Sequence, residues 1–114
     1  MPLPTQPGWP LQTSTLSACG IRTRVLQGGA DLKATEAVVF VHGNPGSGED
    51  WRELMQVTSP VARVIALDMP GFGQADKPAN YPYSVEGGTA FLTEALKQLG
   101  VVRAHLVLHD FGGP

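Results

Sequence analysis

Three short apolar runs, each followed at once by a loop rich in glycine, constrain the fold of this chain most strongly. The runs comprise residues 37–41, 61–67 and 104–108. Each is too short for a helix and rich in apolar residues, and the first run is mostly β-branched, so each is predicted to be a strand buried on both faces. Buried strands that alternate with helices favour a parallel sheet. The sequence therefore predicts an α/β fold.

Two helices and a hairpin complete the expected order of elements. Residues 14–27 carry aliphatic side chains among threonine and serine, with Gly20 midway, which predicts a β-hairpin. A short helix is expected after its N-cap Ser47, and a longer helix between Ser84 and Gly100. Their predicted core faces consist of side chains at helical spacing, namely Trp51, Leu54, Met55 and Thr58 in the first helix and Leu92, Ala95, Leu96 and Leu99 in the second.

Composition and charge exclude several classes of protein. The 114 residues carry a net charge of −2, which argues against the basic face of a nucleic-acid binder, so no nucleic-acid partner is expected. No run approaches the ~20 apolar residues of a membrane span, and residues 1–10 do not read as a secretory signal. We therefore expect a cytoplasmic protein without a membrane partner. The single cysteine, Cys19, excludes an internal disulfide and a cysteine-based zinc cluster.

The end of the third apolar run carries the sharpest candidate site. Leu108 is followed by His109, Asp110 and Phe111, and then by two glycines. A charged residue in such a strand-to-helix turn is typical of a nucleophile elbow, which lifts one side chain above the sheet and directs the next N–H to the same point. Asp110 would then be the nucleophile and Phe111 an N–H donor. A cap for the following helix is an equally open interpretation of Asp110.

A second candidate site lies in the turn after the first apolar run, residues 42–46. The backbone N–H of Asn44 is a candidate to form, with that of Phe111, a two-donor oxyanion hole. An ordinary turn between strand and helix is the alternative. His42 is interpreted as a hydrogen-bonded structural histidine. The glycines of this loop have phosphate-loop spacing, but two acidic residues follow where lysine and serine or threonine are needed, which excludes a nucleotide site.

Two further groups of polar residues are interpreted as structural. Asp68, after the second run, has the position of a metal-binding acid in a GTPase loop, but the phosphate loop is missing. It is therefore expected to be a buried carboxylate that accepts hydrogen bonds from loop N–H groups. His105 and His109 share a strand face but lie roughly 13 Å apart at 3.3 Å per residue. They are not expected to share a metal ion.

The three loops together resemble the α/β-hydrolase fold family. The resemblance covers residues 14–114 and rests on three segments that occur in order: VVFVHGNPGSGEDW, ALDMPGFGQADKP and LVLHDFGGP. The aspartate at the elbow is similar to the branch that contains haloalkane dehalogenases, epoxide hydrolases and haloacetate dehalogenases. The resemblance implies that Asp110 is the nucleophile and that the N–H groups of Asn44 and Phe111 form the oxyanion hole. A small organic substrate and water are the expected partners, without cofactor or metal.

The mechanism implied by the resemblance suits an aspartate. Aspartate, with an ordinary pKa of about 3.9, is ionised at pH 7 and attacks an sp³ carbon without a base. Attack displaces a halide or opens an epoxide and leaves an ester, which histidine-activated water then hydrolyses. Phe111 lacks the N–H with which tryptophan binds halide in many dehalogenases, whereas Asn44 matches a halide donor of others. Halide and epoxide therefore stay open. Further alternatives are an ester or lactone hydrolase, a non-catalytic ligand-binding module and a naturally truncated, inactive module.

The rest of the family machinery is expected beyond this chain. Family members carry the orienting acid, the catalytic histidine and the cap domain after the elbow, and none of the three histidines here fits the catalytic role. We therefore expect a flexible arm, 1–13, followed by the incomplete N-terminal portion of a hydrolase core domain, 14–114. By itself this portion is expected to be inactive and to aggregate through strand 104–108 at an open sheet edge. The oligomeric state is not indicated.

Overall fold

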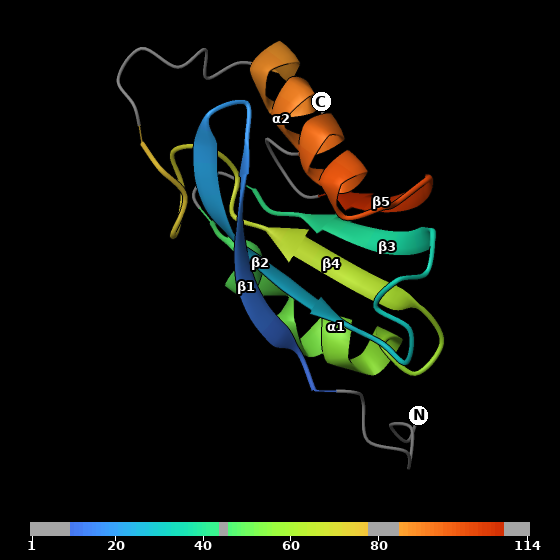
Figure 1. The fold of residues 1–114 in the computed structure, drawn as a ribbon. Coiled ribbons are helices and arrows are strands. Elements are labelled where there is room, and N and C mark those ends of the chain that lie inside the picture. Colours follow the sequence, from blue (N-terminus) through green and yellow to red (C-terminus); the bar gives the residue numbers. More distant parts are fainter. Residues whose placement is uncertain (1–9, 44–45, 78–84, 109–114) are drawn as a thin grey trace.

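The computed structural model describes residues 10–43, 46–77 and 85–108. Within them, five strands form one mixed sheet in the order β1-β2-β4-β3-β5, accompanied by helices (Figure 1). The bounds in chain order are β1 Gln12–Ala18, β2 Ile21–Gly28, β3 Glu36–Val41, the 3₁₀ helix η1 Gly48–Trp51, α1 Arg52–Thr58, β4 Arg63–Leu67, α2 Val85–Gln98 and β5 Arg103–Leu108. The predicted order of a hairpin followed by alternating strands and helices is confirmed, and with it the α/β class.

The strands β1 and β2 form the predicted hairpin. They pair antiparallel with Ala18 opposite Ile21, so the turn consists of Cys19 and Gly20, with φ of 51° and 77°. A two-residue turn with positive φ at both positions matches the right-handed twist of its strands. The prediction of a turn near Gly20 is therefore confirmed, and β1 begins at Gln12, ahead of the expected start.

The other three strands place their carboxyl ends at one edge of the sheet. β3 lies between β4 and β5 and runs parallel to both. Phe40 pairs with Ala66 on one side, and Val41 pairs with Leu108 on the other. Because the strands are parallel, the loops that follow them leave the sheet side by side, where ligands bind in open α/β sheets. β2 pairs antiparallel with β4, which makes the sheet mixed.

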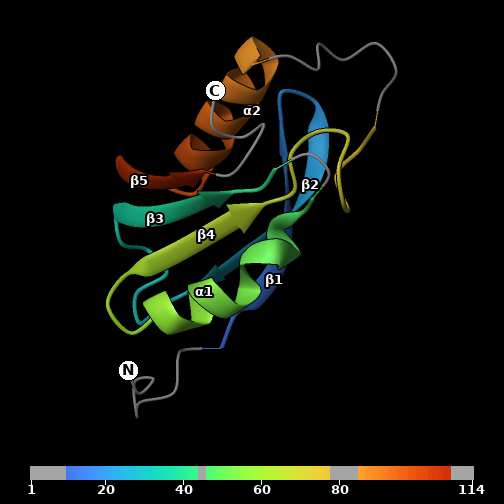
Figure 2. The same ribbon diagram turned by 180° about the vertical axis from the view of Figure 1, so that it is seen from behind.

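The helices cover opposite faces of the sheet (Figures 1 and 2). Alternate strand residues point to each face. The α2 face is packed by Phe91 and Ala95 against one set of strand residues, which includes Val39, Val41, Ile65 and Leu67. The α1 face is packed by Met55 against the other set, which includes Leu26, Phe40, Val64 and Ala66. No helix in the described ranges has the length and apolar character needed to cross a membrane.

The predicted core faces of both helices are confirmed in part, since Met55 and Ala95 are buried as expected. Leu54 was expected in the core but is 45% exposed, whereas its neighbour Met55 is fully buried. The first turn, Gly48–Trp51, is 3₁₀ rather than α-helical, and α1 begins only at Arg52. In α2 the core face centres on Phe91 and Ala95, and the three predicted leucines are only partly buried at its margins.

The strand β5 was predicted to be buried on both faces, and this prediction is wrong. Leu106 and Leu108 are 51% and 42% exposed. The reason is the position of β5 at the edge of the described sheet, where it pairs with β3 alone. The expectation of an open apolar edge is thereby confirmed. By contrast, every residue of β4 is buried, although β4 begins at Arg63 and leaves Val61 outside the strand and 85% exposed.

Candidate active site

The candidate site is the edge of the sheet at which β3, β4 and β5 end. The pairing of Val41 with Leu108 sets the last residues of β3 and β5 beside each other. The predicted nucleophile Asp110 and the predicted N–H donors Asn44 and Phe111 lie outside the described residues. The structure describes what surrounds them in sequence, namely the flanks of the loop after β3 and the loop after β4.

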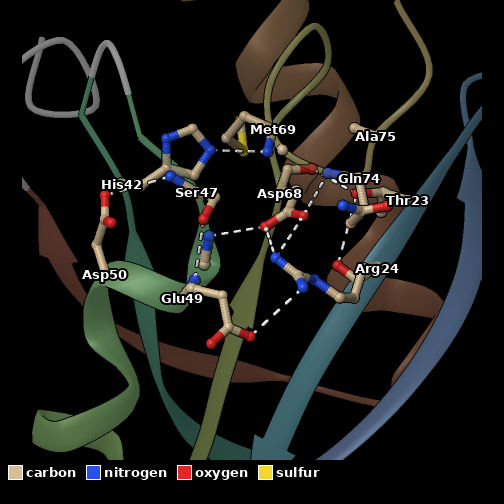
Figure 3. A network of polar contacts seen from close by, with 12 residues as sticks. Thr23, Arg24, His42, Ser47, Glu49, Asp50, Asp68, Met69, Gln74 and Ala75 are labelled. Atoms are coloured by element: carbon tan, nitrogen blue, oxygen red, sulfur yellow. Dashed lines mark hydrogen bonds and ion pairs between the residues drawn. The ribbon is translucent and has the colours of Figure 1, made fainter.

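The carboxylate of Asp68 is the centre of a polar network at this edge (Figure 3). Asp68 directly follows β4, and 1% of it is exposed. Its Oδ1 accepts a hydrogen bond from the N–H of Gly48 at 2.7 Å, and its Oδ2 accepts one from the N–H of Gln74, also at 2.7 Å. The prediction that Asp68 is a buried carboxylate that accepts loop N–H groups is confirmed.

A guanidinium group balances the charge of this buried carboxylate. Arg24, on β2, approaches Oδ2 of Asp68 with Nη2 at 3.0 Å and Oε2 of Glu49 with Nη1 at 3.4 Å. Arg52 donates two further hydrogen bonds of 2.7 Å to the carboxylate of Glu49. The hydrogen bonds from Arg52, aided by the charge of Arg24, lower the pKa of Glu49, and the same contact raises the pKa of Arg52. Asp68, Arg24, Glu49 and Arg52 therefore form a series of alternating charges that extends from the buried carboxylate to the surface.

His42 has the structural role that the sequence predicted. It is 3% exposed, and its Nε2 accepts a hydrogen bond from the N–H of Met69 at 2.9 Å. Its Nδ1 lies 2.8 Å from the carbonyl oxygen of Gly43, to which it donates in the tautomer that Met69 requires. The ring of Phe72 packs edge-on, with 5.2 Å between the ring centroids. Because both nitrogens are engaged, His42 has none left to serve as a general base in this arrangement.

Close approach explains the glycines of these loops. A Cβ on Gly73, which has φ of +52°, would lie 2.5 Å from Oδ2 of Asp68 and 2.9 Å from Cβ of Ser47. A Cβ on Gly46 would lie 2.8 Å from the carbonyl oxygen of Gly43. Such distances leave no room for a side chain. Glycine at 46 and 73 therefore serves packing around Asp68 and His42, in agreement with the rejection of a phosphate-binding loop.

The loop after β3 ends in a well-formed helix start. Ser47 is the N-cap, as predicted, and its side chain accepts a hydrogen bond from the N–H of Glu49 at 3.2 Å. The carboxylate of Asp50 completes a capping box by accepting the N–H of Ser47 at 3.2 Å. These two hydrogen bonds therefore fix Ser47, at the C-terminal end of the loop after β3, against the first turn of η1.

Sequence reasoning missed Arg24. An arginine on a strand of a predicted hairpin is ordinarily a solvent-facing residue, and the sequence contains no sign of the antiparallel pairing of Val25 with Leu67 that brings it to Asp68.

The described part of the chain holds no group of three or more residues that could ligate a metal. His105, expected not to share a metal with His109, is exposed and contacts the carboxylate of Glu36 on β3.

Known proteins share both the sequence pattern and the fold of this chain. The family model for the alpha/beta hydrolase fold matches residues 36–114, a range that includes β3, β4, β5 and the loops around the candidate site. The chain belongs to the α/β-hydrolase fold family. Membership confirms the resemblance found in the sequence, and it assigns the five-stranded mixed sheet to the N-terminal part of this fold.

Relatives within the α/β-hydrolase family include dehalogenases and epoxide hydrolases. A haloalkane dehalogenase from Bradyrhizobium diazoefficiens is 43% identical over 75 residues, which are 66% of this chain and 24% of that protein. The crystal structure of the haloalkane dehalogenase DbeA from Bradyrhizobium elkani matches with a TM-score of 0.81 and 30% identity, over 90% of this chain and 34% of the other. An epoxide hydrolase from Vigna radiata matches with a TM-score of 0.80 and 27% identity, over 90% and 32%. The chain thus spans about a quarter of the curated dehalogenase.

Proposed function

We propose that this chain forms part of a hydrolase that cleaves a carbon–halogen or epoxide bond with Asp110 as the nucleophile. The observation that carries the proposal is the parallel register of β3 and β5, in which Val41 lies opposite Leu108. In that register the segments that contain Asn44 and Asp110 start from neighbouring positions at the same edge of the sheet. A nucleophile and an oxyanion hole need this proximity.

The proposed reaction has two steps, and each balances its bonds and charges. In the first, a carboxylate oxygen of Asp110 forms a bond to the substrate carbon. Either the carbon–halogen bond breaks and the halide leaves with the bonding electron pair, or one epoxide C–O bond breaks and the ring oxygen, still attached to the neighbouring carbon, takes a proton from water. In the second, water adds to the ester carbonyl of Asp110 while a histidine base takes its proton. The resulting oxyanion is held by the N–H groups of Asn44 and Phe111. Its collapse breaks the bond to the substrate oxygen, which takes the proton held by the histidine and leaves as the alcohol, and the carboxylic acid of Asp110 then ionises to restore the carboxylate.

The described histidines support a base supplied from elsewhere in the full-length protein. Both ring nitrogens of His42 are occupied by the N–H of Met69 and the carbonyl of Gly43. His105 is exposed on β5 and contacts Glu36. This chain covers only 24% of the curated dehalogenase and 34% of DbeA, which leaves ample sequence for a base, an orienting acid and a substrate-covering region.

The test is to trap the ester in the full-length protein that carries this sequence. The histidine base is replaced so that the second step stops, and the protein is incubated separately with 1-bromobutane and with styrene oxide. Mass spectrometry of the intact protein and its peptides should find an ester on Asp110 with one of the two probes. The probe that reacts identifies the substrate class, and absence of an ester with both contradicts the proposal.

Matched variants separate catalysis from folding. Asp110→Asn should abolish turnover and ester formation while the unfolding transition stays cooperative. Asp76→Asn makes the same chemical change at an exposed residue of the loop after β4, whose carboxylate accepts only the N–H of Arg22 among the contacts described for it, and it should retain turnover. Hydrolysis of a p-nitrophenyl ester that survives in Asp110→Asn would favour an ester hydrolase instead.

We also propose that residues 1–114 alone are inactive and prone to associate. The exposed apolar side chains of Leu106 and Leu108 lie on β5, the edge strand of the described sheet. Exposed apolar edges pair with other strands. Light scattering and turnover of the isolated chain test this directly: a monodisperse and active 114-residue protein would contradict it.

A further inference from the structure

Two successive residues after β4 hold both flanks of the loop after β3. The N–H of Met69 donates to Nε2 of His42 at 2.9 Å, which fixes the start of that loop. The carboxylate of Asp68 accepts the N–H of Gly48 at 2.7 Å, which fixes its end. Figure 3 shows His42 and Ser47 from the loop on one side of this pair of residues and Arg24 on the other. Both described flanks of the loop are therefore bonded to the residues that follow β4.

The carboxylate of Asp68 cannot be turned or replaced without loss. One oxygen accepts the N–H of Gly48 and the other accepts the N–H of Gln74, while Nη2 of Arg24 contacts both oxygens. A Cβ at Gly73 would lie 2.5 Å from Oδ2, so the carboxylate packs closely against the backbone of the loop after β4. A neutral amide of the same shape would present an NH₂ group to one of the two N–H donors, and that flank would lose its acceptor.

We propose that Asp68 is a positioning residue for the hydrolytic step, in which it keeps the loop after β3 at the height where its N–H groups meet the oxyanion. This inference rests on the proposed function, because Asn44 lies between the two flanks in the sequence. Asp68 itself touches neither substrate nor nucleophile in this scheme. It acts through Gly48, and through Arg24, which holds the carboxylate in place.

The proposal predicts an effect on one step of the reaction only. In the first step the negative charge of the nucleophile passes to the leaving halide or epoxide oxygen, and no oxyanion forms on the ester carbonyl. In the second step the oxyanion forms, and its N–H donors lower the barrier. Loss of Asp68 should therefore slow hydrolysis of the ester while its formation is spared. A residue that only supports the fold would reduce both steps together, through the fraction of active protein.

The experiment measures both steps in the full-length protein with Asp68→Asn. 1-Bromobutane and styrene oxide are mixed with enzyme, the reaction is quenched at successive times, and the ester on Asp110 is quantified by mass spectrometry. Ester formation should change less than about threefold, whereas its hydrolysis should slow about 10- to 100-fold, the range expected for a displaced donor. The ester then accumulates although the histidine base is intact. Asp76→Asn, in the same loop, should behave as the unaltered protein does.

A second variant keeps the inference testable if Asp68→Asn does not fold. Arg24→Met removes the partner of Asp68 but none of its N–H donors, and Arg24 is partly exposed. It should also slow hydrolysis relative to formation, by a smaller factor. An unchanged ratio of the two rates in every folded variant would overturn the positioning role and leave the nucleophile intact. Absence of the ester in every protein, including the one without its histidine base, would instead overturn the proposed function and this inference with it.

Discussion

Buried charges of opposite sign lie at the two ends of β4, and they differ in the groups that neutralise them. Arg63 is the first residue of the strand and Asp68 follows its last, with 5% and 1% exposed. Arg63 donates to the carbonyl oxygens of Ala34 at 2.7 Å and Leu99 at 3.0 Å, and to Oε1 of Gln27 at 3.1 Å. Asp68 accepts loop N–H groups. The guanidinium thus donates to main-chain carbonyl groups, and the carboxylate accepts from main-chain N–H groups.

The difference lies in the counter-charge. Asp68 contacts the guanidinium of Arg24, whereas the side-chain nitrogens of Arg63 donate to neutral oxygens. Burial lowers the pKa of Arg63, and the charge of Asp31 partly offsets this effect. Arg63 joins the loop before β3 to the end of α2, at the edge opposite the candidate site. Buried charge therefore serves stability at one end of β4, and at the other end we propose that it also serves catalysis.

The largest expected effect tests the stability end. Arg63→Met keeps most of the aliphatic bulk but leaves two main-chain carbonyl groups without their donor. We expect the free energy of unfolding to fall by about 4 kcal/mol, because each unsatisfied buried acceptor costs 1–3 kcal/mol. Turnover per folded molecule should be unchanged. Urea denaturation and active-site titration measure the two quantities. Arg103→Met, at an exposed residue of β5, is the control, and a loss of the same size there would refute the role of burial.

The next effect sharpens the comparison at the other end. Gly73→Ala adds a Cβ 2.5 Å from Oδ2 of Asp68 at a residue with φ of +52°. Gly100→Ala meets no atom within 4 Å at φ of +75°, so it isolates the cost of the left-handed conformation. We expect losses of about 3 and about 1 kcal/mol, respectively, in the free energy of unfolding. Hydrolysis of the trapped ester should slow in Gly73→Ala alone. Equal behaviour of the two variants would show that crowding of Asp68 is unimportant.

The smallest effect concerns Glu49, at the exposed end of the charge network. Its pKa is lowered by Arg52 and Arg24, so its contribution is present above the ordinary value of about 4.5 and is lost as the pH falls through the lowered pKa. Because its side chain is 40% exposed, Glu49→Gln should cost no more than about 0.5 kcal/mol at pH 7. Unfolding curves at pH 7 and pH 3 should show the difference shrinking in acid. If the difference in the free energy of unfolding between the two proteins is the same at both pH values, it arises from packing and not from the charge of Glu49.

Local pattern predicted those features that depend on neighbours in the sequence. The apolar runs predicted β3 and β4, the glycine after an extended polar stretch predicted the hairpin, and the position of Asp68 after a buried strand predicted its N–H partners. Ser47 was predicted as a cap for the same reason. Each of these depends on the alternation of side chains or on a turn of a few residues, which the chain specifies locally.

Features that depend on contacts between segments far apart in the chain could not be predicted from the sequence. Arg24 reaches Asp68 because β2 pairs with β4, which no local pattern indicates. The strand β5 is half exposed because only β3 lies beside it in the described sheet. Leu54 is 45% exposed although its spacing fits the helical period, because the neighbouring Met55 is the residue of α1 that meets the core of the sheet. The nucleophile Asp110 and the donors Asn44 and Phe111 stay predictions, since they lie outside the described residues.

The uninterrupted burial of β4 has a consequence for engineering in this family. Its alternating residues pack into two separate cores, Ile65 and Leu67 on one side and Val64 and Ala66 on the other. Insertion or deletion of one residue would exchange the two sets and turn Asp68 away from the loop after β3. Loops and active-site segments grafted between α/β-hydrolases should therefore be exchanged together with a β4 of unchanged length, so that the spacing between its two terminal charges is inherited as one unit.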